Sequence, residues 1–182
     1  MLMEKSLVSH SKFLSLVLRH KPEAIGIKLD NQGWIPIAEL IGAAEKSGRK
    51  IDHDTLLRVV HENDKQRFAI SLDGKQIRAS QGHSVDIELG LSPSNPPDIL
   101  YHGTVEKFIA SIKCSGLISG KRQHVHLSSN TETAGIVAKR RGIPVILIIA
   151  ANKMNDAGFD FYLSANGVWL CNAVPTEYIE FP

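Results

Sequence analysis

Arginine and histidine residues stand together at several points of this sequence where a regular element is expected to end. Arg19 and His20 are adjacent in "LVLRHKP", at the end of an amphipathic stretch that is typical of a helix. Arg140 and Arg141 are adjacent in "KRRGIPVIL", where another helix is expected to close. A helix dipole stabilises cations at its C-terminus, and the same side chains also bind anions. Each pair is therefore either a solvated basic helix end or part of an anion-binding site.

Three further positions carry side chains of the same kind. Arg67, in "NDKQRFAI", is either a surface residue or another cation of such a site. His102 is expected at the end of a strand in "YHGT", where a small Gly-Thr pair would let a ligand approach the backbone. His126 alternates with apolar neighbours in "HVHLS", so it faces away from them. His102 is explained equally well as a hydrogen-bonded structural histidine, and His126 as a polar group on the face of a sheet.

Several familiar catalytic signatures are missing from the sequence. It has no Walker loop, no GxGxxG after a strand, no GxSxG and no HExxH. Its two cysteines, Cys114 and Cys171, form no CxxC, and no Cys/His group has zinc spacing, so we expect two buried structural thiols and no metal.

Composition sets limits on the class of protein. The 182 residues suffice for one large or two small domains, and 43% are apolar, so a sizeable core is expected. The net charge of +2 is too mild to indicate nucleic-acid binding, so RNA phosphates would have to meet a few placed arginines. The longest apolar run, residues 145–151, is too short for a membrane span, and the start does not resemble a secretory signal. We expect a cytoplasmic protein without a membrane partner.

A proline-rich segment, "GLSPSNPPDI", predicts a linker at about residues 90–98 between lobes 1–90 and 98–182. In the first lobe we expect one helix ending near His20, a second beginning around Pro36, and a third capped by Asp52. A β-hairpin that turns at Asp73-Gly74 follows. Three helices followed by a hairpin are typical of a winged helix, although other small helical lobes share this order.

The second lobe is richer in strands. "ILYHGT", "HVHLS" and "PVILIIAA" predict strands, and "FDFYLSANGVWLCNAV" predicts a hairpin around Asn166-Gly167. Helices are expected over "EKFIASIKCSG", which Gly116 closes, and from about Thr131 to Arg141. The fold class is therefore α+β, with a mixed and mostly antiparallel sheet in this lobe.

Seven segments, taken in order and almost end to end, resemble one family, the NAD-dependent RNA 2′-phosphotransferases, also known as tRNA 2′-phosphotransferases. The segments are "SKFLSLVLRHKPEAIGIKLDNQGW", "DKQRF", "IRASQGHS", "YHGT", "HVHLS", "RRGIPVIL" and "NGVWL". The resemblance implies an N-terminal winged-helix lobe and a C-terminal ADP-ribosyltransferase-like lobe.

The resemblance also implies an activity and its catalytic residues. The family removes an internal 2′-phosphate from RNA with NAD as acceptor, through an ADP-ribosylated RNA 2′-phosphate. The products are ADP-ribose 1″,2″-cyclic phosphate, nicotinamide and RNA with a 2′-hydroxyl. Its Arg-His-Arg-Arg tetrad falls on Arg19, His20, Arg67 and Arg140, with Arg141 as an adjacent competitor for the last position. Three arginines and a histidine would bind a phosphate dianion without a metal.

For NAD, the related transferase fold uses a His-His-apolar signature. The resemblance places it on His102, His126 and Val168, with Gly103, Thr104 and Ser128 beside them. The expected partners are NAD as co-substrate and RNA with an internal 2′-phosphate, such as spliced tRNA, and we expect a monomer.

Two other functions stay open at this point. One is a non-catalytic winged-helix regulator that senses NAD, although the third expected helix, "DHDTLLRVVHEND", is more acidic than a DNA-reading helix should be. The other is an ADP-ribosyltransferase that acts on terminal phosphates of nucleic acid or on protein side chains. Transferases that act on protein often use a catalytic glutamate near the acceptor, and "NGVWL" offers only Val168 at that position.

Overall fold

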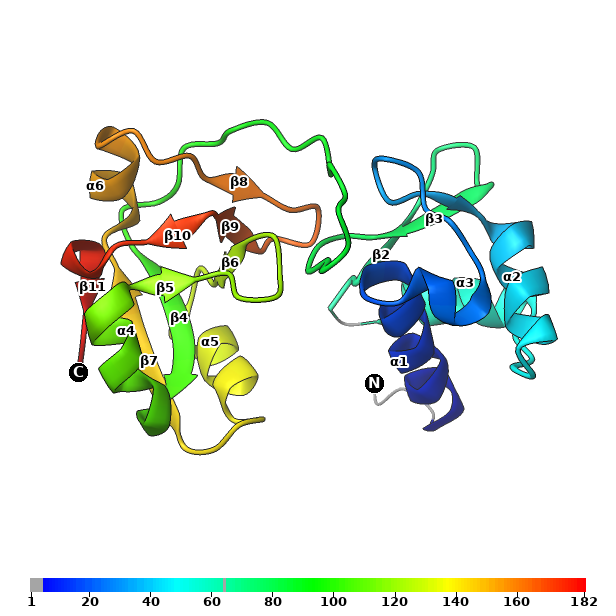
Figure 1. The fold of residues 1–182 in the computed structure, drawn as a ribbon, viewed down its shortest axis with the longest axis horizontal. Helices are drawn as coiled ribbons and strands as arrows, with labels where there is room; N and C mark the ends of the chain where they lie inside the picture. The colour runs from blue at the N-terminus through cyan, green and yellow to red at the C-terminus, as the bar shows by residue number, and fades with distance from the viewer. Residues whose placement is uncertain (1–4, 64) are drawn as a thin grey trace. The chain divides into compact units, whose positions relative to one another are not determined.

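The computed structural model describes residues 5–63 and 65–182 of the chain. The first four residues of the start segment, and Asp64 of "DKQRF", lie outside the described residues. The chain divides into two compact units, one up to Gly90 and one from Leu91 onward (Figure 1). Both are mixed structures of helices and antiparallel sheets, so the predicted α+β class is confirmed.

Unit 1 consists of helices and one small sheet. Its helices are α1 (Lys5–Arg19), the 3₁₀ helix η1 (Pro22–Ile25), α2 (Ile37–Lys46) and α3 (His53–His61). Its strands are β1 (Ile35–Pro36), β2 (Phe68–Ile70) and β3 (Gln76–Ala79), which form an antiparallel sheet in the order β1-β3-β2. The predicted succession of three α-helices and a hairpin is confirmed.

Local chemistry explains where these elements begin and end. The Asp52 carboxylate accepts a hydrogen bond from Thr55 N at 2.7 Å and so caps α3, as predicted. Gly74 adopts φ +73° in the turn between β2 and β3, where its lack of a Cβ removes the steric cost. Pro36 precedes α2 with an extended backbone (φ −57°, ψ 130°), and the helix begins at the next residue, in agreement with a start predicted around Pro36.

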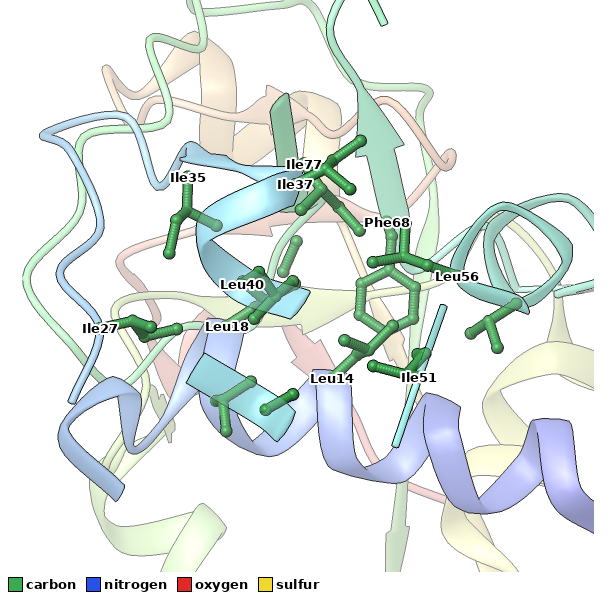
Figure 2. Packing of buried hydrophobic residues seen from close by; sticks show 14 of the residues in the cluster. Leu14, Leu18, Ile27, Ile35, Ile37, Leu40, Ile51, Leu56, Phe68 and Ile77 are labelled. Atoms are coloured by element: carbon green, nitrogen blue, oxygen red, sulfur yellow. The ribbon is translucent and has the colours of Figure 1, made fainter. Parts of the chain in front are cut away.

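The core of unit 1 joins all of its elements. Figure 2 shows Leu14 and Leu18 of α1 pointing toward Leu40 of α2 and toward Phe68 of β2. Side chains from α3 and β3, such as Leu56, complete the cluster. Because α1 contributes fully buried residues up to Leu18, this packing fixes the position of the Arg19-His20 pair that follows.

Unit 2 is built mainly from short strands. Its strands are β4 (Leu100–Val105), β5 (Leu117–Ile118), β6 (Val125–Leu127), β7 (Pro144–Ile149), β8 (Tyr162–Leu163), β9 (Trp169–Cys171), β10 (Ala173–Val174) and β11 (Ile179–Glu180). Its helices are η2 (Glu106–Phe108), α4 (Ile109–Ser115), α5 (Thr131–Ala138), α6 (Ala151–Asp156) and η3 (Thr176–Tyr178). The strands form antiparallel sheets in the orders β11-β7-β4, β6-β9-β8 and β10-β5.

Two connections place the elements of unit 2. Tyr101 and Ser128 exchange backbone hydrogen bonds of 2.9 and 2.8 Å, which join β4 to the end of β6. Helix α5 packs on β4 and β7, and Figure 1 shows it beside β4. The predicted hairpin turn at Asn166-Gly167 is confirmed, with β8 paired to β9 and φ +75° at Gly167.

Three expectations for unit 2 were wrong. His102 lies in the middle of β4 rather than at its end, because the strand continues to Val105. Helix α5 ends at Ala138, where Arg141 N turns back to the Ala138 carbonyl at 2.8 Å, so Arg140 and Arg141 lie in a turn. Cys114 is exposed; only Cys171 is a buried thiol, and burial raises its pKa to about 12.

The proline-rich segment packs for part of its length on unit 2. Ser94 N donates to the Phe161 carbonyl at 2.8 Å, and Pro93 forms a bridge with Tyr162. Across residues 5–63 and 65–182, every helix is too short or too polar to cross a bilayer.

Candidate functional site

Unit 1 brings three of the predicted residues together. The Arg19 guanidinium donates from Nη2 to the Arg67 carbonyl at 3.0 Å, across 48 positions of sequence. The same carbonyl accepts Ser80 N at 2.9 Å, and Ser80 Oγ donates to the Gln66 carbonyl at 2.9 Å. Both arginines are half-buried. The tip of α1 and the segment that leads into β2 are therefore joined through Arg19.

Arg67 is itself held in place. Its Nη1 donates to Asn63 Oδ1 at 3.0 Å. The preceding residue, Gln66, has φ +40°, a backbone conformation that side-chain-bearing residues seldom adopt. The surroundings thus dictate the backbone at Arg67, which indicates a residue with a required position.

His20 is positioned by Ser84. Its Nδ1 shares a 2.9 Å hydrogen bond with the Ser84 hydroxyl, and Ser84 N donates to the Arg19 carbonyl at 2.9 Å. Ser84 belongs to "IRASQGHS", to which sequence reasoning assigned no role. Because the serine contacts both residues of the pair, it fixes the orientation of the exposed His20 ring.

His83, the neighbour of Ser84, is a buried histidine of a different kind. Its side chain is 1% exposed, and neither ring nitrogen has a hydrogen-bond partner among the described residues. Burial lowers its pKa to about 4, with a further contribution from the charges of Arg19, His20 and Arg78. His83 is therefore a buried, neutral imidazole at ordinary pH, within electrostatic reach of Arg19 and His20.

In unit 2, the two predicted histidines are joined. His102 Nδ1 donates to the His126 carbonyl at 3.0 Å. Since a carbonyl can only accept, Nδ1 carries the proton and Nε2 of the neutral ring is an acceptor. Burial lowers the pKa of His102, and the charges of Arg141 and Arg122 lower it further against the opposing effect of the His126 carbonyl. At neutral pH this ring therefore offers a fixed acceptor at Nε2.

Arg122 is a residue that sequence reasoning missed. Its Nη1 contacts His126 Nδ1 at 3.2 Å, so the arginine donates and this nitrogen accepts. Burial by neighbouring protein atoms lowers the pKa of Arg122, with smaller effects from Arg141 and then Arg140. The available sequence signal was its place four residues before His126 in "RQHVHLS", which lacks the adjacent pairing that drew attention elsewhere.

The predicted Arg140 and its competitor Arg141 are both exposed. The charge of Arg141 lowers the pKa of both His102 and Arg122, and the charge of Arg140 lowers that of Arg122. Of the three arginines, Arg122 is thus the one with a direct contact to a predicted NAD-binding residue.

The remaining predicted residues contribute to the packing and strand pairing of unit 2. A Cβ at Gly103 would lie 1.9 Å from the Ala134 carbonyl oxygen, so α5 rather than a ligand requires this glycine. Thr104 is buried, at 6% exposure. Ser128 pairs with β4 through its backbone, and Val168 exchanges hydrogen bonds with Ser164 in the turn before β9. These residues shape the strands around His102 and His126.

Titratable groups suited to a metal are not gathered in the described part of the chain, where no three His, Cys, Asp or Glu residues form a group that could hold an ion. Each unit instead carries its own set of arginines and histidines. Guanidinium and imidazole groups are the side chains typical of the class of proteins that bind anionic ligands.

Comparisons with known proteins narrow this class to one family. The family model described as "RNA 2′-phosphotransferase, Tpt1 / KptA family" matches residues 5–173, so the chain belongs to this family. A protein of Flavobacterium johnsoniae named "Probable RNA 2′-phosphotransferase" is 54% identical over 173 residues, which cover 95% of each chain. Proteins of the same name from Hahella chejuensis and Rhodopirellula baltica are each 52% identical, over 98% of this chain and 96% and 98% of theirs.

Proposed function

We propose that the protein removes an internal 2′-phosphate from RNA by transferring it to NAD. The observation that carries this proposal is membership of the RNA 2′-phosphotransferase family across nearly the whole chain. The relatives that share about half of its residues bear the name of this activity. The protein is accordingly a transferase with RNA as its substrate, and its cytoplasmic location and monomeric state remain predictions.

The cluster of unit 1 suits a phosphate monoester. A 2′-phosphate is a dianion, and guanidinium groups offer it permanent charge and paired donors. Arg19 and Arg67 are linked through one carbonyl, and Ser84 holds His20 beside them. Arg19 and His20 are thus oriented before substrate arrives, which lowers the entropic cost of binding.

The residues of unit 2 fit NAD by their chemistry. The fixed Nε2 acceptor of His102 can receive a ribose hydroxyl, and the positive charges of Arg122 and Arg141 suit a pyrophosphate. The backbone pairs formed by Ser128 and Val168, and the close packing at Gly103 and Thr104, support the strands that present these groups. His126 would act through its contact with Arg122.

The proposed reaction has two steps. A phosphate oxygen of the RNA first attacks the anomeric carbon of the nicotinamide ribose, nicotinamide leaves, and an ADP-ribosylated RNA 2′-phosphate results. The ribose 2″-hydroxyl then attacks phosphorus and expels the RNA 2′-oxygen, which gives ADP-ribose 1″,2″-cyclic phosphate and a 2′-hydroxyl. Negative charge grows on the phosphoryl oxygens in the second step, where Arg19 and Arg67 would stabilise it. His20 would orient the phosphate or protonate the departing oxygen.

The last arginine of the Arg-His-Arg-Arg tetrad falls within the sequence of unit 2. Sequence similarity proposes Arg140, whereas the contact with His126 favours Arg122. Arg122 and Arg140 are therefore both candidates for this position, and Arg141, the sequence neighbour of Arg140, is a third.

The folds of the two units complete the proposal. Three α-helices followed by a hairpin, with β1 added to the sheet, support a winged helix for unit 1. The short antiparallel sheets of unit 2, with paired histidines on β4 and β6, support an ADP-ribosyltransferase-like fold.

The test uses an oligoribonucleotide with one internal 2′-phosphate, incubated with and without NAD under single-turnover conditions. We expect NAD-dependent loss of the phosphate, with release of nicotinamide and the cyclic phosphate. Arg67→Ala should slow this by about 10²–10³, as for the loss of one oxyanion donor. Among Arg122→Ala, Arg140→Ala and Arg141→Ala, the first should have the largest effect.

A matched control is Arg49→Ala in unit 1, since Arg49 lies over the Phe13 ring and bonds Ser9 away from the predicted residues. It should retain the parental rate. An ADP-ribosylated product without cyclic phosphate would indicate a transferase that modifies nucleic acid, and NAD binding without turnover would indicate a sensor. Either result contradicts the proposal.

A further inference from the structure

The residue that holds Arg67 has no role in the reaction described above. Asn63 follows α3 and is 3% exposed, so it cannot contact a ligand of any size. Its Oδ1 accepts from Arg67 Nη1 at 3.0 Å and from Lys65 N at 3.1 Å. Its Nδ2 donates to Ser11 Oγ on α1 at 3.2 Å, and Ser11 is 5% exposed. We propose that Asn63 is a positioning residue that sets the direction of the Arg67 guanidinium; this rests on the proposed function.

The contacts of Asn63 allow one orientation of its amide. Arg67 and the Lys65 N–H are both donors, so they require the oxygen. Rotation by half a turn would place the NH₂ group against these two donors, although the Ser11 hydroxyl could still donate to the rotated oxygen. Burial removes water as a substitute partner. The two donors at its oxygen therefore fix the orientation of the amide.

The same contacts tie Arg67 to α1 twice. One path runs from Ser11 through Asn63 to the Arg67 guanidinium, and the other runs from the Arg67 carbonyl to Arg19. An arginine side chain has many rotamers, and fixing one of them before substrate binds removes that entropic cost from binding. The strained backbone at Gln66 indicates that the position of the next residue is imposed by such ties.

The neutral chemistry of the amide also matters. An amide oxygen directs a guanidinium without placing a negative charge beside it. A carboxylate at the same place would direct it equally well but would compete with a phosphate for the positive charge. Asparagine therefore suits an arginine that must be oriented and still attract an anion.

The first measurement needs no substrate. Arginine side-chain ¹⁵N relaxation reports the mobility of each guanidinium, and the Arg67 signal is assigned by its loss in Arg67→Lys. Asn63→Ala should increase the mobility of Arg67 and leave that of Arg49, which bonds Ser9, unchanged. An Arg67 signal that stays as rigid as in the parent overturns the proposal, whatever the enzyme does with RNA.

The second measurement is a double-mutant cycle on single-turnover rates. Asn63→Ala should slow phosphate removal by about tenfold in the parent, and by less than twofold when Arg67 is already alanine, because coupled residues are not additive. Equal factors in both backgrounds would show that Asn63 acts independently of Arg67. A parent that removes no 2′-phosphate while Asn63→Ala still loosens Arg67 contradicts the proposed function and leaves the positioning role standing.

Since Asn63 is buried, its truncation also lowers stability, and two variants separate this effect. Val59→Ala creates a cavity at a fully buried residue of α3, the helix that precedes Asn63. It should lower the melting temperature but keep the Arg67 mobility and the rate. Ser11→Ala removes only the far hydroxyl and should loosen Arg67 in the same direction by a smaller amount. A rigid Arg67 in Ser11→Ala together with a mobile one in Val59→Ala would contradict the proposal.

Discussion

In unit 1, Arg19 and Arg67 are half-buried and share one backbone carbonyl. In unit 2 the arginines lie outside the regular elements, whereas His102 and His126 lie within strands and are joined by a hydrogen bond. Arg19 ends a helix that contributes the fully buried Val17 and Leu18 just before it, and Arg67 leads directly into a strand. Arg122 instead precedes β6 in a loop, and Arg140 follows α5 in a turn. The first unit has oriented its cations in advance, and the second has oriented its hydrogen-bond acceptors.

This difference indicates where each unit is sensitive to change. A unit that orients charge depends on hydrogen bonds at the ends of its elements. A unit that orients acceptors depends on how closely its strands and helices pack, because the strand backbone places the histidines. The two tryptophans allow the units to be followed separately, since Trp34 belongs to unit 1 and Trp169 to unit 2.

The largest effect is expected at the packing of unit 2. In Gly103→Ala the new methyl group would lie 1.9 Å from the Ala134 carbonyl oxygen and 3.1 Å from the Ala138 methyl. Backbone cannot move aside as a side chain does, so we expect a loss above about 3 kcal/mol, at the upper end for overpacked sites. Trp169 fluorescence during urea unfolding, in a Trp34→Phe background, should show unit 2 unfolding early.

The matched control is Gly135→Ala, in α5 of the same unit, where the added methyl would find only the Ile146 side chain at 3.9 Å. Its free energy of unfolding should rise by up to about 1 kcal/mol, because alanine has a higher helix propensity than glycine. Should Gly103→Ala be as stable as the parent, close packing of α5 on β4 is not what places His102.

Sequence patterns predicted the elements whose ends are set by local chemistry. The Asp52 cap and the turns at Gly74 and Gly167 depend on residues within a few positions of each other, and all three were found as expected. The end of α5 was missed because two exposed arginines after Ala138 favour a helix as readily as the turn they occupy.

The candidate site divides in the same way. Arg19, His20 and Arg67 could be singled out by residue type and by similarity, but their contacts join positions 48 and 64 apart. No local pattern reveals that Asn63 orients Arg67, or that Gly103 serves a helix 31 positions later, since packing makes those contacts. Spacing alone also gave no reason to prefer Arg122 to an adjacent arginine pair.

A second prediction concerns the buried imidazole of unit 1. The pKa of His83 is about 4 in the folded chain and about 6.5 when exposed, so the unfolded chain takes up its proton first as the pH falls. The stability due to neutral His83 is fully present above pH 6.5 and is lost progressively down to about pH 4, by about 3 kcal/mol in total. Burial is the main cause of this lowered pKa, and the charges of Arg19, His20 and Arg78 are the smaller causes included in it.

His83→Leu should abolish that part of the acid sensitivity. Because the ring nitrogens have no partner among the described residues, an apolar side chain of similar volume should cost little at pH 7. Urea unfolding followed through Trp34, in a Trp169→Phe background, would be compared between parent and variant from pH 7 to pH 4. If the free energy of unfolding falls with pH equally in parent and variant, His83 is already protonated, or hydrogen-bonded, in the folded protein.

The smallest effect is expected from a matched pair of helix caps. Asp52 caps α3 in unit 1 through Thr55 N, and Asn130 caps α5 in unit 2 through Thr133 N at 2.8 Å. Asn130→Ala should cost unit 2 about 1 kcal/mol at every pH, because an amide does not titrate. The hydrogen bonds from Thr55 lower the pKa of Asp52, so its contribution is present above the ordinary aspartate range and is lost as the pH falls through the lowered value.

Exchanging the caps tests whether this pH dependence belongs to the residue or to the unit. Asp52→Asn should keep α3 capped and remove the loss of unit 1 stability below about pH 4, and Asn130→Asp should introduce such a loss in unit 2. Urea unfolding followed separately through Trp34 and Trp169 would show whether the acid-dependent loss of stability moves with the aspartate. The measurement is made below about pH 4, where the contribution of His83 has already been lost. If the acid sensitivity stays with unit 1 after the exchange, it arises from groups other than the cap, and the units differ in more than the way they orient their charged side chains.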